Sequence, residues 1–458
     1  MAALAEILLD RGAELSGSDV PETFYTDRIL RRLGIPYAES FDPANIGSHV
    51  QLVIHSAAYE RSSNPELLAA AQRGIPLLSY PEALGLLSES CDSSGISGTH
   101  GKTTTAALSG MILKAWNLPA TILAGSEVTG FGNRSTLILG HRYLVAETCE
   151  YRRHFLHFHP QRIVVTAVEA DHLDYFRDLE DVREAFLGYC RSLPPQGQLI
   201  INSDDSGAGE VLERIRRERE DIRIIPYGLS AEGRFRISGI ESEAGCIRFR
   251  LAGVEEELHL EYPGIHSVFN AAAALALSSC ILEVEGRDLT AELQQAMAEA
   301  LADFRGSRRR SEILGTAGGV LFIDDYGHHP TEISSTLEGL RSFYPERRIV
   351  VDFMSHTYSR TRALLPEFAT CFRAADLVVL HRIYASARET DNARVDGRTL
   401  FEEVSRHHPQ AVYFEEPEEA IPYLEDILKS GDLLVTMGAG DNWRIGRMIL
   451  EAKVEAAQ

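Results

Sequence analysis

The chain has 458 residues, enough for about three domains at a typical size of roughly 150 residues each. Its 67 acidic and 45 basic residues give a formal net charge of -22, which argues against a general role in binding nucleic acid or anionic membranes. The six cysteines lie far apart without a C-x-x-C pair, and no run of about 18 strictly apolar residues is present, so we expect a cytoplasmic protein with reduced thiols and no membrane-spanning segment.

The first ninety residues have the pattern of one α/β unit. The opening stretch, "MAALAEILLDRGAEL", has the period of an amphipathic helix and no cleavage site, so we interpret it as a helix and not as a signal peptide. Short apolar runs at 15–19, 50–57 and 75–80 are predicted to end strands. We therefore expect a first unit over residues 1–90.

A glycine-rich segment, "CDSSGISGTHGKTTT" (91–105), opens a second predicted unit that extends to residue 306. Its Gly-Lys-Thr triplet is typical of a phosphate-binding loop, although that motif usually has its first glycine where Ile96 stands here. Backbone N–H groups of such a loop point at phosphate oxygens, aided by the N-terminus of the next helix. We expect the loop to follow a turn and to enter a helix; the alternative is a turn that binds nothing. The candidate phosphate-binding residues are Gly98, Gly101, Lys102 and Thr103.

Acidic side chains follow two predicted strands of this unit. Glu147 ends the strand at 143–147, and Glu150 comes one turn later. Ligands of open α/β sheets sit at the carboxyl ends of strands, and Mg²⁺ prefers carboxylate oxygen, so both clusters are candidate metal ligands. From spacing alone, a structural role is the favoured interpretation of His172, which belongs to the second cluster. The second cluster, after the strand at 162–168, contains Glu169, Asp171, His172 and Asp174.

The third predicted unit, residues 307–458, has strand-then-helix pairs. Its strands are predicted at 319–325, 347–353, 375–380 and 432–440. Directly after the first of them stands "DDYGHHPTE" (324–332), for which a helix-capping turn is the alternative to a functional role. "SHTYSRTR" (355–362) presents Arg360 and Arg362, suited to a carboxylate or phosphate.

Two histidine-rich segments look less functional than their composition suggests. "HFLHFHP" (154–160) has near-metal spacing, but no cysteine or acid completes a zinc set. "RHHP" (406–409) is predicted to be surface. The arginine triplet at 308–310 would ordinarily be a solvated charge run, but it lies at the junction of the second and third units, where a nucleotide could bridge.

Five motifs in this order resemble those of the Mur ligase family over essentially the whole chain: G-T-H-G-K-T-T, a strand ending in A-E, E-A-D-H, P-G-x-H-x-x-x-N and D-D-Y-G-H-H-P-T-E. The resemblance implies an α/β fold of three domains: a Rossmann-like N-terminal domain for a UDP-sugar, a central P-loop ATPase-like domain for ATP and Mg²⁺, and a Rossmann-like C-terminal domain. The nearest pattern is that of the members that join L-alanine to the carboxylate of UDP-N-acetylmuramate through an acyl phosphate, in peptidoglycan precursor synthesis.

The resemblance also implies roles for individual residues. Lys102, His328, His329 and Arg360 would be catalytic, and Thr103, Glu147 and His172 would hold the metal. Ser18, Asp19, Glu150, His328 and Arg360 would contact the substrates. ATP would be bound by Gly98, Thr99, His100, Gly101, Lys102, Thr103, Thr104, His266, Asn270, Arg310 and Asp325.

The chain departs from the family pattern at several positions. Ser267 and Ala167 stand where the family has asparagine, Ser311 replaces a phenylalanine, and Thr357 stands where many members have arginine. The family also opens with a strand and a G-x-G-G-x-G-M turn for the UDP pyrophosphate, whereas this sequence begins at the position of that methionine, Met1. We therefore expect either a misplaced start or a truncated first domain, with weak UDP-sugar binding and normal ATP binding.

Three alternatives remain at this point. The recycling ligase that adds a whole tripeptide to UDP-N-acetylmuramate shares most of the motifs and differs in its amine pocket. Folylpolyglutamate synthase shares the loop but lacks D-D-Y-G-H-H-P. A catalytically impaired nucleotide-binding homologue would account for Ser267, Ala167 and the missing glycine turn. The sequence leaves the oligomeric state open.

Overall fold

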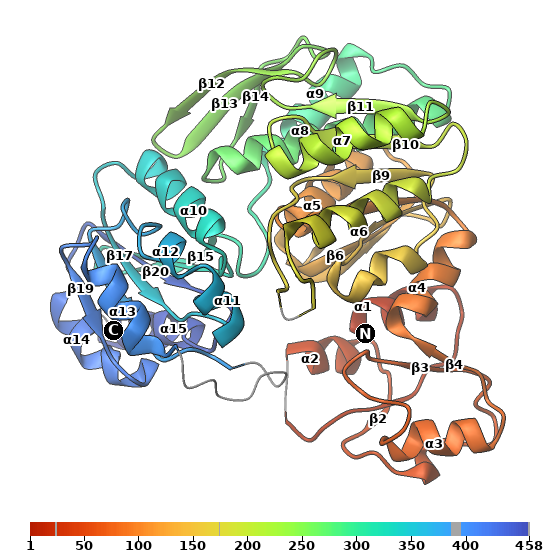
Figure 1. Cartoon of the computed structure of the whole chain (residues 1–458), viewed down its shortest axis with the longest axis horizontal. Helices are drawn as coiled ribbons and strands as arrows, with labels where there is room; N and C mark the ends of the chain where they lie inside the picture. Colours follow the sequence, from red (N-terminus) through yellow and green to blue (C-terminus); the bar gives the residue numbers. More distant parts are fainter. Residues whose placement is uncertain (23–24, 174, 386–394, 457–458) are drawn as a thin grey trace.

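The computed structural model describes residues 1–22, 25–173, 175–385 and 395–456, so the candidate ligand Asp174 lies outside the described residues. Figure 1 shows three groups of elements that follow one another along the chain, with the C-terminal group facing the central group across α10. The expected α/β class with mainly parallel sheets is confirmed.

The first group contains two small parallel sheets. β1 (Gly17–Ser18) pairs with β2 (Tyr37–Ala38), and β3 (Val53–His55) pairs with β4 (Leu77–Ser79). Its helices are α1 (Ala2–Asp10), α2 (Tyr25–Arg32), the 3-10 helix η1 (Pro43–Asn45), α3 (Pro65–Gln72) and α4 (Tyr80–Glu89).

The first group shares a core with the central group. Leu4 and Ile7 of α1 and Leu84 of α4 pack in the same apolar cluster as the central sheet. Glu6 of α1 is 4 % exposed and pairs with Arg134 of the central group at 3.1 Å. The first group is therefore anchored through its first and last helices, while its small sheets lie farther out (Figure 1).

A seven-stranded sheet forms the centre of the second group, in the order β11-β10-β9-β5-β8-β6-β7. All of its neighbours are parallel except the edge pair β6 and β7. Its strands are β5 (Asp92–Ser97), β6 (Ala120–Val128), β7 (Arg134–Ile138), β8 (Tyr143–Glu147), β9 (Arg162–Val165), β10 (Gln198–Asn202) and β11 (Arg223–Tyr227).

Helices cover both faces of this sheet. Val145 of β8 packs with α5, α8 and α9, whereas Leu144 and Ala146 pack with α6 and α7, because successive side chains of a strand point to opposite faces. The helices are α5 (Lys102–Ala115), η2 (Thr129–Phe131), η3 (Tyr151–His157), α6 (Leu179–Arg191), α7 (Ser206–Glu218), α8 (Ile265–Val284) and α9 (Ala291–Ala302).

The helix α8 is the central core helix of this group. Within the described residues it alone is long and apolar enough to cross a membrane, but 83 % of that window is buried inside the structure. Burial on all sides accounts for its apolar composition. Beyond it lies an antiparallel sheet of β12 (Ile237–Glu243), β13 (Cys246–Leu251) and β14 (Leu258–Leu260), which the sequence analysis did not predict.

The third group is built on a six-stranded sheet in the order β15-β16-β20-β17-β18-β19, parallel except for the edge strand β15. Its strands are β15 (Glu312–Ala317), β16 (Val320–Asp325), β17 (Arg348–Phe353), β18 (Leu377–Leu380), β19 (Ala411–Tyr413) and β20 (Asp432–Met437). Its helices are α10 (Pro330–Phe343), α11 (Tyr358–Ala363), α12 (Leu365–Phe368), α13 (Gly397–Ser405), η4 (Pro417–Ala420), α14 (Ile421–Ile427) and α15 (Trp443–Glu455).

A fully buried charged network ties the carboxyl ends of β17 and β18 together. His381 Nε2 lies 2.9 Å from Asp352 Oδ2, and His381 Nδ1 lies 3.2 Å from the carbonyl oxygen of Phe414. Asn442 donates its amide to Asp352 Oδ1 at 2.8 Å. Burial lowers the pKa of His381, but the Asp352 carboxylate outweighs it and raises the pKa above its usual value. Both ring nitrogens therefore carry protons, and the charged pair fixes the strand ends from which the loop before α11 begins.

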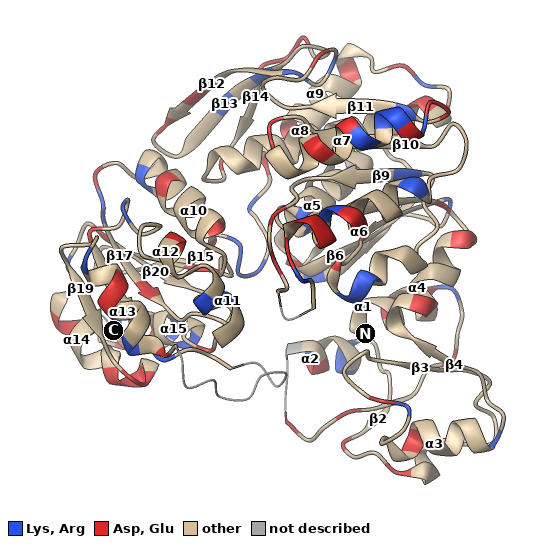
Figure 2. Cartoon of the chain, in the orientation of Figure 1, with Lys and Arg blue, Asp and Glu red and all other residues tan. Residues whose placement is uncertain are grey.

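The large negative charge is distributed over the molecule and is partly compensated by local ion pairs. Figure 2 shows Lys and Arg alternating with Asp and Glu along α6 and α7. Arg214 of α7 pairs with Glu180 and Glu184 of α6, and Arg191 of α6 pairs with Glu218 of α7. These pairs join two neighbouring helices on one face of the central sheet.

Candidate functional site

The predicted phosphate loop connects a buried strand to a helix, so the expectation that it follows a turn was wrong. β5 has the sequence DSSGIS and lacks the apolar alternation of an ordinary strand. It is central nonetheless, because its buried serines donate hydrogen bonds to neighbouring backbone, as Ser97 Oγ does to the carbonyl of Val164 at 2.9 Å. The loop then leads directly into α5 at Lys102, as expected.

The backbone conformation of the loop explains why glycine stands at both of its glycine positions. Gly98 has φ 141° and Gly101 has φ 81°, a region that side chains rarely adopt. A Cβ atom on Gly101 would also lie 2.5 Å from Asn270 Oδ1 of α8. The loop is therefore packed closely against α8 where it enters α5.

Lys102 is held by groups of its own protein. Its ammonium donates to the carbonyl oxygen of Gly98 and lies 3.1 Å from Glu150 Oε2. Burial lowers the pKa of Lys102, but the Glu150 carboxylate outweighs it and raises the pKa above its usual value. Burial raises the pKa of Glu150, and Lys102 more than reverses this, so the pKa is lowered. The pair is therefore fully ionised at the mouth of the loop.

Two oxygen donors meet beside the lysine. Thr103 donates its hydroxyl to Glu147 Oε2 at 2.7 Å. A Cβ atom on Gly125 of β6 would lie 2.8 Å from Glu147 Cδ, so the missing side chain leaves room for this carboxylate. Hydroxyl and carboxylate oxygens are the ligands that Mg²⁺ takes in proteins.

His172 approaches the same place from the loop after β9, with φ 54°. Its Nε2 lies 3.5 Å from Glu150 Oε1, and its ring packs on Tyr151 with centroids 4.8 Å apart. Within the described residues, no hydrogen bond or ion pair joins it to Glu147 or Thr103. Of the three expected metal ligands, Thr103 and Glu147 are therefore in contact with each other, whereas His172 contacts Glu150 instead.

A buried ion pair joins the central and C-terminal groups. Arg360 of α11 donates to Asp171 Oδ1 at 2.6 and 3.1 Å, and both side chains are less than a tenth exposed. Burial raises the pKa of Asp171, but Arg360 outweighs it and holds the pKa well below its usual range. The guanidinium predicted to bind a carboxylate is therefore bound to a carboxylate of the protein itself.

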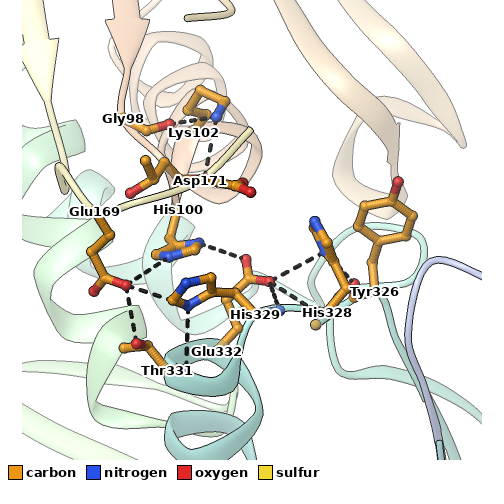
Figure 3. Close-up of polar contacts among 12 residues, drawn as sticks. Gly98, His100, Lys102, Glu169, Asp171, Tyr326, His328, His329, Thr331 and Glu332 are labelled. Carbon is orange, nitrogen blue, oxygen red and sulfur yellow. Dashed lines mark hydrogen bonds and ion pairs between the residues drawn. The ribbon is translucent and has the colours of Figure 1, made fainter. Parts of the chain in front are cut away.

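A second contact between the groups is a cluster of His100, Glu169, His329 and Glu332, which we call the inter-group cluster (Figure 3). His100 Nδ1 lies 3.0 Å from Glu332 Oε1, and His100 Nε2 lies 3.3 Å from Glu169 Oε2. Burial lowers the pKa of His100, but Glu332 and Glu169 outweigh it and raise the pKa to about 10. The loop histidine is therefore charged between two carboxylates, one from each group.

Most other motif residues of the C-terminal group adjoin this cluster. His328 Nδ1 donates to the carbonyl of Tyr326 at 3.0 Å, and burial followed by the charge of Arg360 lowers its pKa to about 3, so the ring is neutral. Arg310 pairs with Glu332 at 3.3 Å.

Asp325 is fixed by backbone. Its carboxylate accepts from the N–H groups of Ser311 and Gly327 at 2.7 Å each, and also from the Ser311 hydroxyl at 3.2 Å. The departure at Ser311 therefore has a structural role: it orients the aspartate expected to face ATP. Thr357 also has a local role, since its hydroxyl accepts from the N–H of Arg360 and caps α11.

A cavity of about 280 Å³ lies between the loop and α10. The residues expected to bind ATP that line it are His100, Gly101, Thr103, Thr104, His266, Asn270, Arg310 and Asp325. Burial lowers the pKa of His266 to about 4, so this ring is neutral. Ala167 also lines the cavity, but Ser267 does not: its hydroxyl donates to the carbonyl of Gly264 at 2.6 Å.

The two walls of the cavity meet backbone to backbone. A Cβ atom on Gly339 of α10 would lie 2.8 Å from the backbone nitrogen of Gly264, which precedes α8. Ile265 and His266 of one wall follow Gly264 directly, and Ser335 and Thr336 of the other lie one helical turn before Gly339.

Ser18 and Asp19 are not brought to the loop. Ser18 donates to Glu66 Oε1 at 2.7 Å, and Asp19 accepts from the hydroxyl of Tyr59 at 3.4 Å, all within the first group. Asn45 also donates to Glu66 Oε1 at 2.7 Å. These residues form a separate polar cluster at the end of β1.

The sequence analysis gave no role to Glu332 and did not pair Asp171 with Arg360. A signal for Glu332 was available, because a glutamate three residues after a helix cap is the signature of a capping box, which His329 and Glu332 form. Asp171 and Arg360 are 189 positions apart, and no local pattern joins them.

The structure gives different outcomes for the two histidine-rich segments, 154–160 and 406–409. Among the described residues, three possible metal ligands come together in the inter-group cluster, His100, Glu169 and His329, whereas the segment 154–160 contributes to no such group. The prediction that 406–409 is surface was wrong for His408, which is 7 % exposed and lies 3.0 Å from the carbonyl of Ala375.

The arginine triplet spans the junction. Arg308 pairs with Glu127, Arg309 with Asp324, and Arg310 with Glu332. The triplet is therefore held by acids of both groups and is not a solvated charge run.

Comparison with known proteins covers almost the whole chain. Models of the Mur ligase family match in three parts: the Mur ligase family catalytic domain at 1–90, the Mur ligase middle domain at 96–278, and the Mur ligase glutamate ligase domain at 309–440. The UDP-N-acetylmuramate--L-alanine ligase of Treponema pallidum (strain Nichols) is 50% identical over 98% of this chain and 93% of its own length. That of Desulfitobacterium hafniense (strain Y51) is 39% identical over 98% and 97%.

Solved structures agree in fold. The UDP-N-acetylmuramate-alanine ligase of Thermotoga maritima is 25% identical, with a TM-score of 0.78, over 100% of this chain and 97% of its own. A murein peptide ligase of Psychrobacter arcticus has a TM-score of 0.62 at 21% identity, over 98% and 95%.

Proposed function

The chain belongs to the Mur ligase family, and from this premise we propose that it joins L-alanine to the carboxylate of UDP-N-acetylmuramate in an ATP-dependent reaction. The observation that supports the proposal is the cavity between the phosphate loop and α10, because His100, Gly101 and Thr103 of the loop line one side and Arg310, Asp325 and Glu332 of the C-terminal group line the other. The identity of 50% to an enzyme of that name supports the choice of substrates.

The proposed chemistry has two steps. The muramoyl carboxylate attacks the γ-phosphorus of ATP, the bond to ADP breaks, and an acyl phosphate forms. The amine of L-alanine then attacks the acyl carbon, loses a proton, and phosphate leaves. Such phosphoryl transfer depends mainly on positioning and on charge neutralisation, and a nucleophilic side chain is not needed.

Lys102 and the loop N–H groups are the proposed phosphate ligands. The carboxylate of Glu150 now holds the ammonium, and a phosphate group, with more negative charge, competes for it. Thr103 and Glu147 fit Mg²⁺, since their oxygens already lie 2.7 Å apart, and His172 is the third proposed ligand. When bound, Mg²⁺ neutralises charge on the transferring phosphate.

The C-terminal residues act on the substrates in this proposal. Arg360 exchanges Asp171 for a substrate carboxylate, since the guanidinium is already arranged around a carboxylate oxygen. His328 and His329, both with lowered pKa, are neutral rings, and in this proposal they face the joining carboxylate and amine. Asp325, Arg310 and His266 contact the nucleotide. Ser18 and Asp19 contact the UDP-sugar in the first group.

We also propose the division into a UDP-sugar domain at 1–90, an ATP and Mg²⁺ domain at 91–306 and a ligase domain at 307–458. A cytoplasmic location agrees with free cysteines and with soluble substrates of this kind. Its role would be in peptidoglycan precursor synthesis.

One assay tests the function. Phosphate release is measured with ATP and Mg²⁺ and with UDP-N-acetylmuramate, L-alanine, both or neither. The proposal expects release only when both are present. Replacement of L-alanine by L-alanyl-γ-D-glutamyl-diaminopimelate tests the tripeptide ligase, which the relatives do not favour. No release with either amine would indicate the impaired homologue.

A further inference from the structure

Asp352, His381 and Asn442, which we call the buried network, have no part in the proposed function. All three side chains are 0 % exposed. A charged pair taken out of water loses solvation that its mutual attraction only partly returns, and apolar side chains of similar volume are often equally stabilising. Stability therefore does not explain why charged groups stand at this place.

The buried network adjoins a bend in the loop after β18. β17 and β18 pair up to their last residues, and the loops that follow them pair once more at His356 and Tyr384. Two residues (354–355) lie between these pairings in the first loop and three (381–383) in the second, so the second loop has one residue in excess. An excess residue of this kind bends the chain and re-aims nearby side chains.

His381 holds this bend from inside the protein. It is the first residue of the longer loop, and its ring nitrogens lie 2.9 Å from Asp352 Oδ2 of β17 and 3.2 Å from the carbonyl oxygen of Phe414, which follows β19. Asn442, directly before α15, donates to the other oxygen of Asp352 at 2.8 Å. The ends of three neighbouring strands and the start of one helix are thereby fixed to one another.

The longer loop in turn holds the segment that leads into α11. Tyr384 donates its N–H to the carbonyl of Ser355 at 2.8 Å and accepts from the N–H of Thr357 at 3.1 Å. Thr357 has φ 68°, which is unfavourable for a β-branched residue and persists only where the surroundings impose it. The contacts with Tyr384 contribute to this constraint.

The same segment determines the direction of α11. Thr357 Oγ1 accepts from the N–H of Arg360 at 3.4 Å, and the buried hydroxyls of Ser355 and Thr361 lie 2.7 Å apart. α11 has only six residues, too few for a helix to be stable alone, so its direction depends on such contacts. Figure 1 shows α11 on the side of the C-terminal group that faces the central group, where Arg360 reaches Asp171.

We infer that the buried network positions the guanidinium of Arg360, through the loop after β18 and the segment before α11. His381 is thus a positioning residue, since it acts through Tyr384 and Thr357. For the ion pair of Arg360 with Asp171, the inference stands on these contacts alone. For the binding of a substrate carboxylate by Arg360, it rests on the proposed function.

A double-mutant cycle on stability tests the inference without any substrate. His381→Gln is introduced into the wild type and into the variant Asp171→Asn/Arg360→Met, and the melting temperature of all four full-length chains is measured. If the network positions Arg360, His381→Gln also weakens the ion pair, so it lowers the melting temperature more in the wild type than in the chain without the pair. Equal losses in the two backgrounds would overturn the inference.

His408→Gln is the matched control, because it changes another buried histidine of the same group. His408 lies 3.0 Å from the carbonyl oxygens of Ala375 and Gln410, at the amino ends of β18 and β19, whereas α11 lies beyond the carboxyl end of β17. Its losses in the two backgrounds should be equal. If His381→Gln does not fold, Asp352→Asn, which keeps the shape of the side chain, takes its place in the cycle.

Kinetics test the consequence for the substrates. In the phosphate-release assay, His381→Gln should raise the KM of UDP-N-acetylmuramate or of L-alanine by up to about 10²-fold and leave the KM of ATP unchanged. A role in folding alone would lower kcat through loss of active protein, with every KM unchanged, and would overturn the inference for the substrate. A wild type that releases no phosphate would contradict the proposed function, and the stability cycle would still decide whether the network positions Arg360.

Discussion

Arg360 and Asp171 are 189 positions apart in the chain, yet they form a buried ion pair that closes the C-terminal group onto the central one. The same arginine is the proposed carboxylate ligand, so the contact that closes the protein is also the one a substrate must replace. The guanidinium of Arg360 therefore serves both the contact between the two groups and the proposed binding of the substrate carboxylate.

The ion pair predicts an asymmetric effect on stability. Asp171→Asn leaves Arg360 buried without its counter-charge, which typically costs about 3–5 kcal/mol. The double variant Asp171→Asn/Arg360→Met should recover much of the lost melting temperature, since neither charge then remains. If the double variant is as unstable as Asp171→Asn alone, the pair does not join the groups as described.

Lys102→Ala should reduce phosphate release by about 10²–10³-fold or more, because the substitution removes the ammonium that neutralises the transferring phosphate. It also leaves Glu150, 1 % exposed, without its partner, so the single variant should be less stable. Lys102→Ala/Glu150→Gln is the matched variant: we expect recovered stability and no recovered activity. Near-wild-type turnover in either would contradict the role of the lysine.

Glu147→Gln should raise the Mg²⁺ concentration needed for half-maximal phosphate release while changing the melting temperature little. The amide still accepts from the Thr103 hydroxyl but carries no charge for the metal. Titrating Mg²⁺ at fixed substrates measures this, with Glu127→Gln of the Arg308 pair as a control outside the proposed metal site. An unchanged Mg²⁺ requirement with a lower melting temperature would indicate a structural role.

The Asp352–His381 pair predicts a pH-dependent stability. Its folded pKa is raised, so the stabilisation is fully present below the unfolded histidine pKa of about 6.5 and is lost as pH rises through the folded value. The difference in melting temperature between wild type and His381→Gln should therefore be largest at acidic pH. It should shrink as the pH rises through the folded pKa of His381. In an Asp352→Asn background the difference should lose this pH dependence; a difference that instead grows with pH would contradict a charged His381.

Ser267→Asn, which restores the family residue, should destabilise the protein and leave nucleotide affinity no better. Ser267 is 1 % exposed and its hydroxyl is already bonded to the carbonyl of Gly264, so the larger side chain must displace its neighbours at about 1–3 kcal/mol. Thermal unfolding and calorimetry with an ATP analogue measure the two effects. Tighter nucleotide binding would show that the asparagine reaches the cavity.

Local patterns predicted the parts of the fold that rest on local chemistry. β8 and β16 were expected from β-branched runs, and both end in acids that lie at the carboxyl edge of their sheets. β5 was missed because its buried serines replace apolar alternation with hydrogen bonds that only the folded sheet supplies.

The candidate site was predictable residue by residue but not as an arrangement. The glycines and Lys102 of the loop carry a motif, whereas the partners of His100 come from Glu169 and from Glu332 of another group. Which charges neutralise one another depends on how the groups pack, and the same motif permits other pairings. The inter-group cluster could therefore be found only in three dimensions.

The contact between Gly264 and Gly339 sets the separation between the two walls of the cavity beside α10. The two walls are held apart only by two backbones in direct contact. A side chain at position 339 would therefore push α10 away from the segment that precedes α8. Gly339 belongs to none of the motifs quoted above, so a Gly339→Val chain would keep every one of them, although its new side chain would meet the backbone of Gly264.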